Sequence, residues 1–452
     1  MKGKKRKLEL LSFYDHTGIE RHLADMAQKG WMIERMSNYF WTYRKIQPRK
    51  LIFTVSYFPK VSDFDPGPSE AQQTLFDFCA ETGWALACTW FQMQVFYSAE
   101  ENPTPIHTEP SLEVAAIHNA CKKNYLRIYK VLCLIAALAT ILFLSSLISD
   151  TLRLLASPTA LFLGMGCTLL FLYTLVELRV YNAWHRKAKK QGEYGMFLDT
   201  PSTAGFQKGM LLLLSLCLLY WLVSLAATGN SFLLVLFLAV LLCLAAVSAS
   251  ARTVKEFLKQ RRVPSKINRG VTAAASFVVA LLLWSGVLAL GVQLFVHADL
   301  KDLPAYAEAP FTISDLRETA YDDYLTTVSP DKSLFLERLE VRQQHGLDDG
   351  PSADIPELQY ELYRVKVPAL YGFCEKQLKR LAILSTFWKG KLVEQDAAPW
   401  GAERTYRLYA DSDTKSSTYL LCYPGLLVRV EFSWEPSGEQ MGQIGRRLGA
   451  YG

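Results

Sequence analysis

Cysteine and charge are both scarce in this 452-residue chain, and each scarcity excludes a class of protein. Nine cysteines are too few for a small scaffold held together by disulfides. Charged residues make up 20% of the sequence, whereas 50% is apolar and 12% aromatic, which excludes a disordered or fibrous chain. The seven histidines form no zinc-ligand spacing, and the sequence lacks a nucleotide-binding loop and a Gly-x-Ser-x-Gly motif. The sequence therefore predicts no enzyme, no metal site and no cofactor.

The apolar residues are concentrated between residues 125 and 297, in five long runs without charge. A helix needs roughly 20 mostly apolar residues to cross a bilayer. The runs that meet this length are Val131–Ile148, Pro158–Val176, Gly209–Ala227, Ser231–Ala249 and Val271–Val296. We therefore expect a multi-pass α-helical protein of the cell membrane with five spans. A set of helices buried in a large soluble core is the alternative.

Ionisable residues are missing from the middle of these runs. Glu177, Arg179 and His297 stand at run ends, where we expect them to reach the membrane interface. The spans are mostly Leu, Ala, Val and Phe, a composition typical of helices that anchor and pack. This absence weakens, without removing, the alternative of an ion-coupled transporter.

Lysine and arginine in the connections predict the orientation. The loops 179–208 and 251–269 carry six and seven of them, and the other two connections share Arg153 alone. Loops rich in Lys and Arg stay in the cytoplasm. With five spans, the N-terminus is then cytoplasmic and the C-terminal domain extracytoplasmic.

The basic start of the chain has no apolar stretch behind it, so we do not interpret it as a signal peptide. The same bias of Lys and Arg toward the cytoplasmic side explains most of the net charge of +6 of the whole chain, so we expect no nucleic-acid partner.

The N-terminal region, residues 1–124, alternates between strand-like and helix-like patterns. Leu8–Tyr14 is expected to form a strand, followed by a helix whose capping box pairs Thr17 with Glu20. A second helix is expected to begin at Ser69, and Gly30 and Gly83 to end the two helices. Because a Trp and a hairpin follow each of these glycines, the pattern favours an α+β domain with a ferredoxin-like sheet.

Aromatic residues on the strands exceed what a sheet covered on one face requires. Exposed aromatic patches often mark binding surfaces. The candidate interaction surface consists of Trp31, Trp41, Tyr43, Trp84, Trp90, Phe96 and, in the Pro-rich link after the strands, His107. Two interpretations stay open: these side chains anchor the core, or they form a groove for a partner peptide.

Several N-terminal segments resemble a known family. Phe13-Tyr14-Asp15, the stretch from His22 to Trp31, Gly83-Trp84 and the segment Pro105-Ile106-His107-Thr108 are similar to domain of unknown function 2812. The resemblance covers roughly residues 8–124. It implies a domain that occurs widely in Firmicutes, usually ahead of several membrane spans and often encoded beside PadR-type transcription regulators. A regulatory or envelope-stress role follows from the resemblance, and no catalytic residue does.

The C-terminal region, residues 298–452, is a second α+β domain in which Asp and Glu outnumber Lys and Arg. We expect helices at Ser314–Leu325, Gly372–Leu384 and Ser437–Leu448, a strand at Leu358–Val367, and an antiparallel meander through Thr405–Tyr409, Ser417–Tyr423 and Leu426–Trp434. Cys374 and Cys422 are expected outside the cell, where a disulfide between them or separate burial are the alternatives.

Three domains follow: residues 1–124 in the cytoplasm, 125–297 in the bilayer and 298–452 outside. We expect a membrane signalling or accessory protein whose outer domain binds an unknown extracytoplasmic ligand and whose inner domain binds a cytoplasmic regulator protein. The alternative function is a transport-associated or immunity-type membrane component.

Overall fold

The computed structural model describes most of the chain. The described residues are 3–37, 40–228, 231–297, 309–318, 324–345, 355–386, 390–410 and 414–451. By contacts these residues form two compact units, which are considered separately below. Unit 1 comprises residues 1–140, 166–216 and 239–287, and unit 2 comprises residues 141–165, 217–238 and 288–452.

Among the residues that the structure describes, five helices are long and apolar enough to cross a membrane, which agrees with the expected number of spans. They are α4 (Leu126–Ser149), α6 (Pro158–Gly192), α7 (Ala204–Ala227), α8 (Ser231–Gln260) and α9 (Ser265–His297). Three of them continue well beyond the apolar runs, and α6 has 35 residues. At 1.5 Å per residue α6 is roughly 50 Å long, more than the hydrocarbon core of a bilayer requires. Each of the five helices contributes one stretch to each unit.

The N-terminal part of unit 1 contains two small antiparallel sheets. Their strands are β1 (Lys4–Leu8), β2 (Trp31–Arg35), β3 (Phe40–Lys45), β4 (Ile52–Tyr57), β5 (Ala85–Trp90) and β6 (Met93–Ser98). The first sheet has the order β1-β3-β2 and the second the order β4-β6-β5. The single sheet of a ferredoxin-like arrangement is therefore not confirmed.

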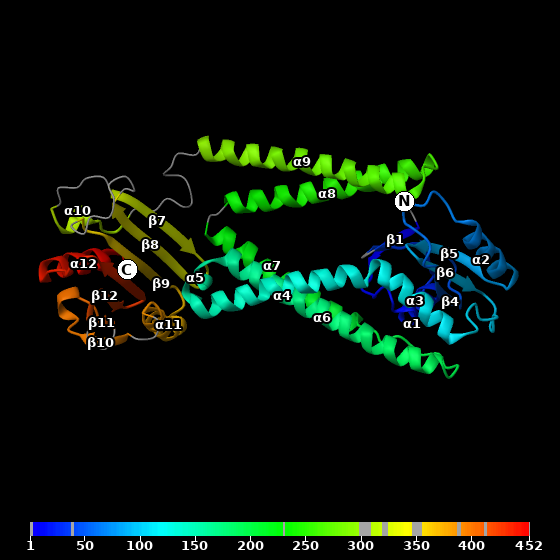
Figure 1. Ribbon diagram of the computed structural model, residues 1–452, viewed down its shortest axis with the longest axis horizontal. Helices are drawn as coiled ribbons and strands as arrows, with labels where there is room; N and C mark the ends of the chain where they lie inside the picture. Colours follow the sequence, from blue (N-terminus) through cyan, green and yellow to red (C-terminus); the bar gives the residue numbers. More distant parts are fainter. Residues whose placement is uncertain are drawn as a thin grey trace. The chain divides into compact units, whose positions relative to one another are not determined.

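Three helices accompany these sheets: α1 (His16–Gln28), α2 (Glu70–Glu81) and α3 (Pro110–Asn124) (Figure 1). The main core of unit 1 joins side chains of both sheets, α1 and α3 to three residues of α6: Tyr181, Trp184 and Ala188. The second half of α6 is therefore part of the core of the N-terminal domain, although the sequence predicts residues 179–208 to be a loop.

Local signals at the helix ends were partly confirmed. Ser69 and Gln72 form the predicted type of capping box at the start of α2, and Gly30 and Gly83 have φ values of 81° and 83°. The box predicted for Thr17 and Glu20 is wrong, because Asp15 caps α1 by accepting a bond from the backbone N–H of Gly18. The strand predicted at Leu8–Tyr14 is also displaced, since β1 ends at Leu8.

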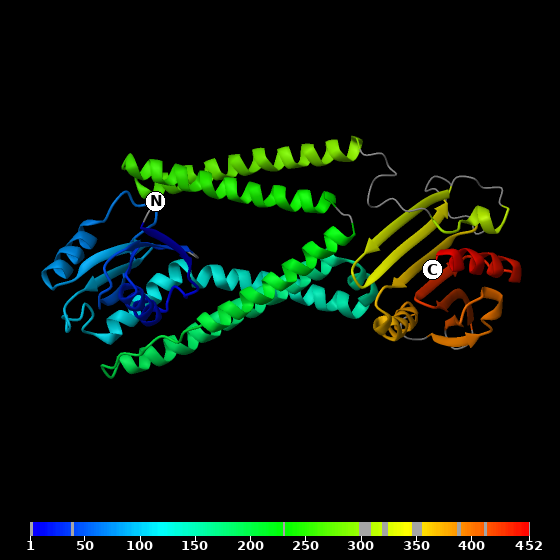
Figure 2. The ribbon, with the colours of Figure 1, turned by 180° about the vertical axis from the view of Figure 1, so that it is seen from behind.

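The C-terminal part of unit 2 is built on one seven-stranded antiparallel sheet with the order β10-β11-β12-β13-β9-β8-β7 (Figures 1 and 2). Its strands are β7 (Tyr324–Lys332), β8 (Leu336–His345), β9 (Leu358–Val365), β10 (Lys391–Gln395), β11 (Arg404–Ala410), β12 (Thr414–Tyr423) and β13 (Leu426–Phe432). The predicted meander corresponds to β11, β12 and β13, with Gly425 at φ 75° in its last turn.

Helices cover both faces of this sheet. One face packs against α10 (Ile313–Leu316) and α12 (Gly438–Tyr451), and the other against α11 (Tyr371–Leu384) and α5 (Thr151–Ala156). Alternation along β12 divides the two cores: Tyr419 and Leu421 belong to the first, and Leu420 and Cys422 to the second. The helix predicted at Ser314–Leu325 is wrong in length, because α10 has four residues and β7 begins at Tyr324.

The short helix α5 lies between the first two spans in the sequence, yet it is a structural part of the C-terminal domain. Leu152 and Ala156 are fully buried in the second core, together with Leu336 and Tyr363 of the sheet. Asp150 begins α5 by accepting a bond from the backbone N–H of Arg153 at 3.1 Å. The connection between α4 and α6 is therefore fixed to the sheet of unit 2.

Candidate functional site

A fully buried carboxylate, Glu177 of α6, is the centre of a polar cluster in unit 1. Oε2 of Glu177 accepts bonds from the hydroxyls of Ser12 and Tyr125, both at 2.8 Å, and Oε1 accepts one from Nε2 of Gln207 at 3.0 Å. The three donors are uncharged. They come from the segment after β1, from the junction of α3 with α4, and from α7. One carboxylate therefore holds four segments together.

The sequence predicts that Glu177 reaches the membrane interface, and the structure shows its side chain fully buried among protein groups. Its run of apolar residues ends at Val176, but the helix continues to Gly192 and its next turns are covered by the N-terminal domain. The signal that could have revealed this is the aromatic and small-residue pattern of Tyr181, Trp184 and Ala188, which lie on one face of α6 at helical spacing.

The first basic loop is held to the start of α1 by a second group of hydrogen bonds. The hydroxyl of Thr200 donates to Oδ1 of Asp15 at 2.6 Å and lies 2.7 Å from the hydroxyl of Thr17. Burial raises the pKa of Asp15, while the bonds from Thr200 and Gly18 lower it. Thr17 is thus engaged by the loop, and this explains why it does not cap the helix.

The second basic loop is held to the segment between β4 and α2. Nζ of Lys255 lies 2.6 Å from Oδ2 of Asp63, and the amide of Asn268 donates to the backbone oxygen of Phe64 at 3.3 Å. Asn268 is fully buried and receives a further bond from Thr272. Both basic loops are therefore fixed to the N-terminal domain within unit 1.

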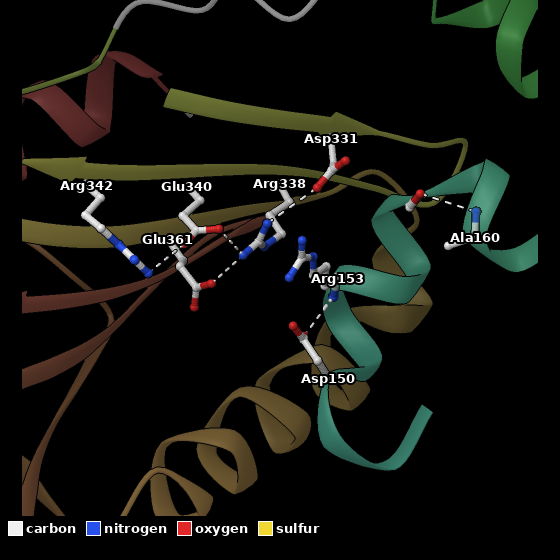
Figure 3. A network of polar contacts seen from close by, with 9 residues as sticks. Asp150, Arg153, Ala160, Asp331, Arg338, Glu340, Arg342 and Glu361 are labelled. Carbon is white, nitrogen blue, oxygen red and sulfur yellow. Dashed lines mark hydrogen bonds and ion pairs between the residues drawn. The ribbon is translucent and has the colours of Figure 1, made fainter. Parts of the chain in front are cut away.

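Unit 2 has its own buried charge, the guanidinium of Arg338 on β8 (Figure 3). It contacts three carboxylates, Asp331 at 3.4 Å, Glu340 at 2.7 Å and Glu361 at 2.6 Å. Burial by itself lowers the pKa of Arg338, but Tyr363 and Glu361 raise it overall. Arg338 is therefore charged and neutralised by several acids, next to the position where α5 packs on β8.

A groove in unit 1 lies beside one of the predicted aromatic residues, Trp90. Its volume is about 1370 Å³, and it lies between the first sheet, the hairpin of β5 and β6, the segment 61–68 and the end of α8. Five cationic residues line it against three acidic ones: Arg6, Arg35, Arg252, Lys255 and Lys259 against Asp63, Asp65 and Glu256.

Aromatic residues face the same groove. Phe40 is 44% exposed, Trp90 is partly buried, and Phe91 has φ 51°, a left-handed backbone that is unfavourable for an aromatic residue. Phe91 is the first residue of the two-residue turn that joins β5 to β6, and turns of this kind require a positive φ at that position. The groove therefore combines positive charge with exposed aromatic surface.

Most of the predicted interaction surface lies elsewhere. Trp41, Tyr43, Trp84 and Phe96 are at most 4% exposed, so these four belong to the core. Trp31, Trp90 and His107 are half-buried, and burial lowers the pKa of His107. Of the seven residues, Trp90 lines the groove. The period-2 pattern of the strands does not reveal which face a second layer covers, because both faces carry large side chains.

Cys374 and Cys422 are both buried in the second core of unit 2, and both are free thiols. Burial raises the pKa of Cys422 to about 11. Separate burial, the alternative to a disulfide, therefore describes the two cysteines. Within the part of the chain that the structure describes, no group of three or more His, Cys, Asp or Glu side chains is arranged to hold a metal ion.

Comparison with curated proteins and with solved structures finds no match to the chain. The N-terminal region, residues 15–129, matches the family described as Protein of unknown function (DUF2812), as its sequence motifs predict.

Proposed function

We propose that the chain is a membrane signalling or accessory protein that links an extracytoplasmic binding domain to a cytoplasmic protein-interaction domain. The observation that carries the proposal concerns α6. This continuous helix follows directly after α5, which is buried in the second core of unit 2, and its last turns are buried in the core of unit 1. We expect a shift of α5 to reach α6, the helix that bears Glu177.

The contacts of the loops support the proposed orientation. Both basic loops, which the charge rule places in the cytoplasm, are held to the N-terminal domain by Thr200 and Lys255. The connection formed by α5, which the same rule places outside, packs on the C-terminal sheet. Each soluble domain thus contacts described membrane connections assigned to its own side: the two basic loops for the N-terminal domain and the α5 connection for the C-terminal domain.

The groove is the proposed docking surface for the cytoplasmic partner. Its positive charge favours an acidic segment with an apolar or aromatic anchor, since interfaces combine buried aromatics with complementary charge. We expect Arg35→Glu with Arg252→Glu to weaken partner capture at least tenfold. Arg49→Glu, an exposed change outside the groove, is the matched control. Equal capture by all three proteins would remove the groove from the proposal.

Topology is the first experiment. A reporter active only outside the cytoplasm, fused to the C-terminus, is expected to be active, and one active only in the cytoplasm is expected to be inactive there. Deletion of residues 298–452 is then expected to abolish any induced response that the intact chain supports. A cytoplasmic C-terminus, or a response that survives the deletion, would contradict the proposal.

A transport-associated role is the second candidate, because Glu177, one residue past the apolar run of the candidate spanning helix α6, is a fully buried carboxyl group. Flux into proteoliposomes that is lost on Glu177→Gln would support this role. The proposal remains non-enzymatic, and retention of phenotype after alanine replacement of His22, His107 and His118 would support that part.

A further inference from the structure

A second cavity of unit 1, about 570 Å³ in volume, lies where the segment from Lys7 to Leu11 and His22 meets the start of α7. Four residues of α7 besides Ala204 line it: Lys208, Leu211, Leu212 and Ser215. Their spacing of i, i+3, i+4 and i+7 places them on one face of the helix. The cavity is therefore bordered by a single stripe of a membrane-spanning helix.

The stripe changes in character along the helix axis. Lys208 is the fifth residue of α7, and the two leucines and Ser215 follow over the next two turns, roughly 10 Å farther along the span. Leu211 is 41% and Leu212 is 61% exposed. A cation at the membrane interface followed by leucines in the hydrocarbon layer matches the order of phosphate and acyl chain in a phospholipid.

The polar end of the cavity is built by residues outside α7. Oε1 of Glu9 lies 3.0 Å from Nζ of Lys7 and 2.9 Å from Nε2 of His22, and it accepts a bond from the hydroxyl of Tyr43 at 3.0 Å. Burial raises the pKa of Glu9, but His22 and Lys7 lower it overall. Glu9 is thus ionised and fixes Lys7 and His22 in place.

The charge balance favours an anion. The two lysines exceed the single carboxylate of Glu9 by one positive charge even when His22 is neutral. Lys208 is exposed and forms no ion pair with any other described residue. We propose that this cavity binds an anionic phospholipid of the inner leaflet, with its phosphate between Lys7 and Lys208 and an acyl chain along Leu211 and Leu212.

The test uses the full-length chain in detergent, titrated with phosphatidylglycerol or phosphatidylcholine and followed by native mass spectrometry. We expect phosphatidylglycerol to bind in preference to phosphatidylcholine. Lys208→Gln and Lys7→Gln are each expected to weaken this binding about fivefold, because a lysine near an anionic headgroup contributes about 1 kcal/mol. Lys190→Gln, an exposed lysine of α6 outside the cavity, is the matched control and is expected to bind as the parent does.

A second variant separates a lipid from a free anion. Ser215→Trp fills the apolar end of the cavity, and we expect it to weaken phosphatidylglycerol binding while Lys7 and Lys208 stay in place. Inorganic phosphate at millimolar concentration is expected not to compete. Equal binding of the two lipids, an equal loss in Lys190→Gln, competition by phosphate, or full binding by Ser215→Trp would each overturn the proposal.

Discussion

Glu177 in unit 1 and Arg338 in unit 2 are both buried ionisable side chains, but their surroundings differ. Glu177 is held by three neutral donors, whereas Arg338 is surrounded by three carboxylates. The neutral donors around Glu177 join several segments and do not repel one another when the central carboxyl group is removed. A charged shell is stable only while its central ion is present, since the acids otherwise repel one another. The comparison predicts that removing the central side chain destabilises unit 2 more than unit 1.

The largest effect is expected from Arg338→Ala. This change leaves Asp331, Glu340 and Glu361 without their shared cation, and breaking a buried pair costs about 3–5 kcal/mol. The measurement is the apparent melting temperature in detergent, with hydrogen exchange to locate the opening in β8 and β9. Arg342→Ala is the control on the same strand, because Arg342 is 44% exposed in its pair with Glu340. Equal effects of the two changes would contradict the comparison.

Glu177→Ala is expected to have the next largest effect. It removes the acceptor of Ser12, Tyr125 and Gln207, and hydrogen bonds to a charged group contribute about 1.5–3 kcal/mol. Hydrogen exchange should rise in the segment 9–15 and at the start of α7, while β13 stays protected. Glu177→Gln keeps one acceptor oxygen and should lose less. Glu193→Ala, an exposed carboxylate beyond the end of α6, should change nothing measurable.

The stability of unit 1 is expected to depend on pH. This effect is smaller, and the pKa values of buried groups predict its direction. Burial raises the pKa of Glu20 to about 8 and that of Glu113 to about 7 from 4.5, so both carboxyls are neutral in the folded protein at pH 6. The folded state then binds more protons than the unfolded state between pH 4.5 and 8, and its stability falls as pH rises through 7 to 8. Burial lowers the pKa of His16 to about 4, which adds a loss of stability below pH 6.5.

The check is the melting temperature of the chain between pH 6.5 and 9. Glu20→Gln should flatten the decline, because its amide oxygen still accepts the backbone N–H of Val55 and carries no charge. Glu34→Gln, an exposed change on β2, serves as the control. A decline of the same slope in Glu20→Gln would show that another group sets the pH dependence.

The smallest effect is expected at the second basic loop. The side chains of Lys255 and Asp63 are 18% and 34% exposed, and partly exposed ion pairs contribute about 0.2–1 kcal/mol. Lys255→Gln should therefore lower stability by less than about 1 kcal/mol and respond to salt, unlike Glu177→Ala. Lys259→Gln, one turn farther along α8, is the comparison variant. A loss as large as that of Glu177→Ala would mean that the loop contact dominates the stability of unit 1.

Local patterns in the sequence determined the five spans, the capping box at Ser69, the glycine helix ends and the meander of β11 to β13. Each depends on residues within a few positions of one another, so apolar runs, turn residues and period-2 alternation suffice. The same patterns did not reveal that α5 packs on the C-terminal sheet, because its partners on β8 and α11 lie 180 residues or more later in the sequence.

Burial was decided by tertiary structure alone. Ser12 and Glu177 are 165 positions apart in the sequence, and nothing in either local segment predicts that they meet. The aromatic residues show the same limit: Trp41 and Phe96 became core and Phe40 stayed exposed, since the covering layer comes from distant segments. The sequence by itself therefore determined the five spans and those helices and strands whose signals lie within a few residues. The folded structure determined which of their charges and rings are removed from water, because burial depends on every layer that packs above a residue.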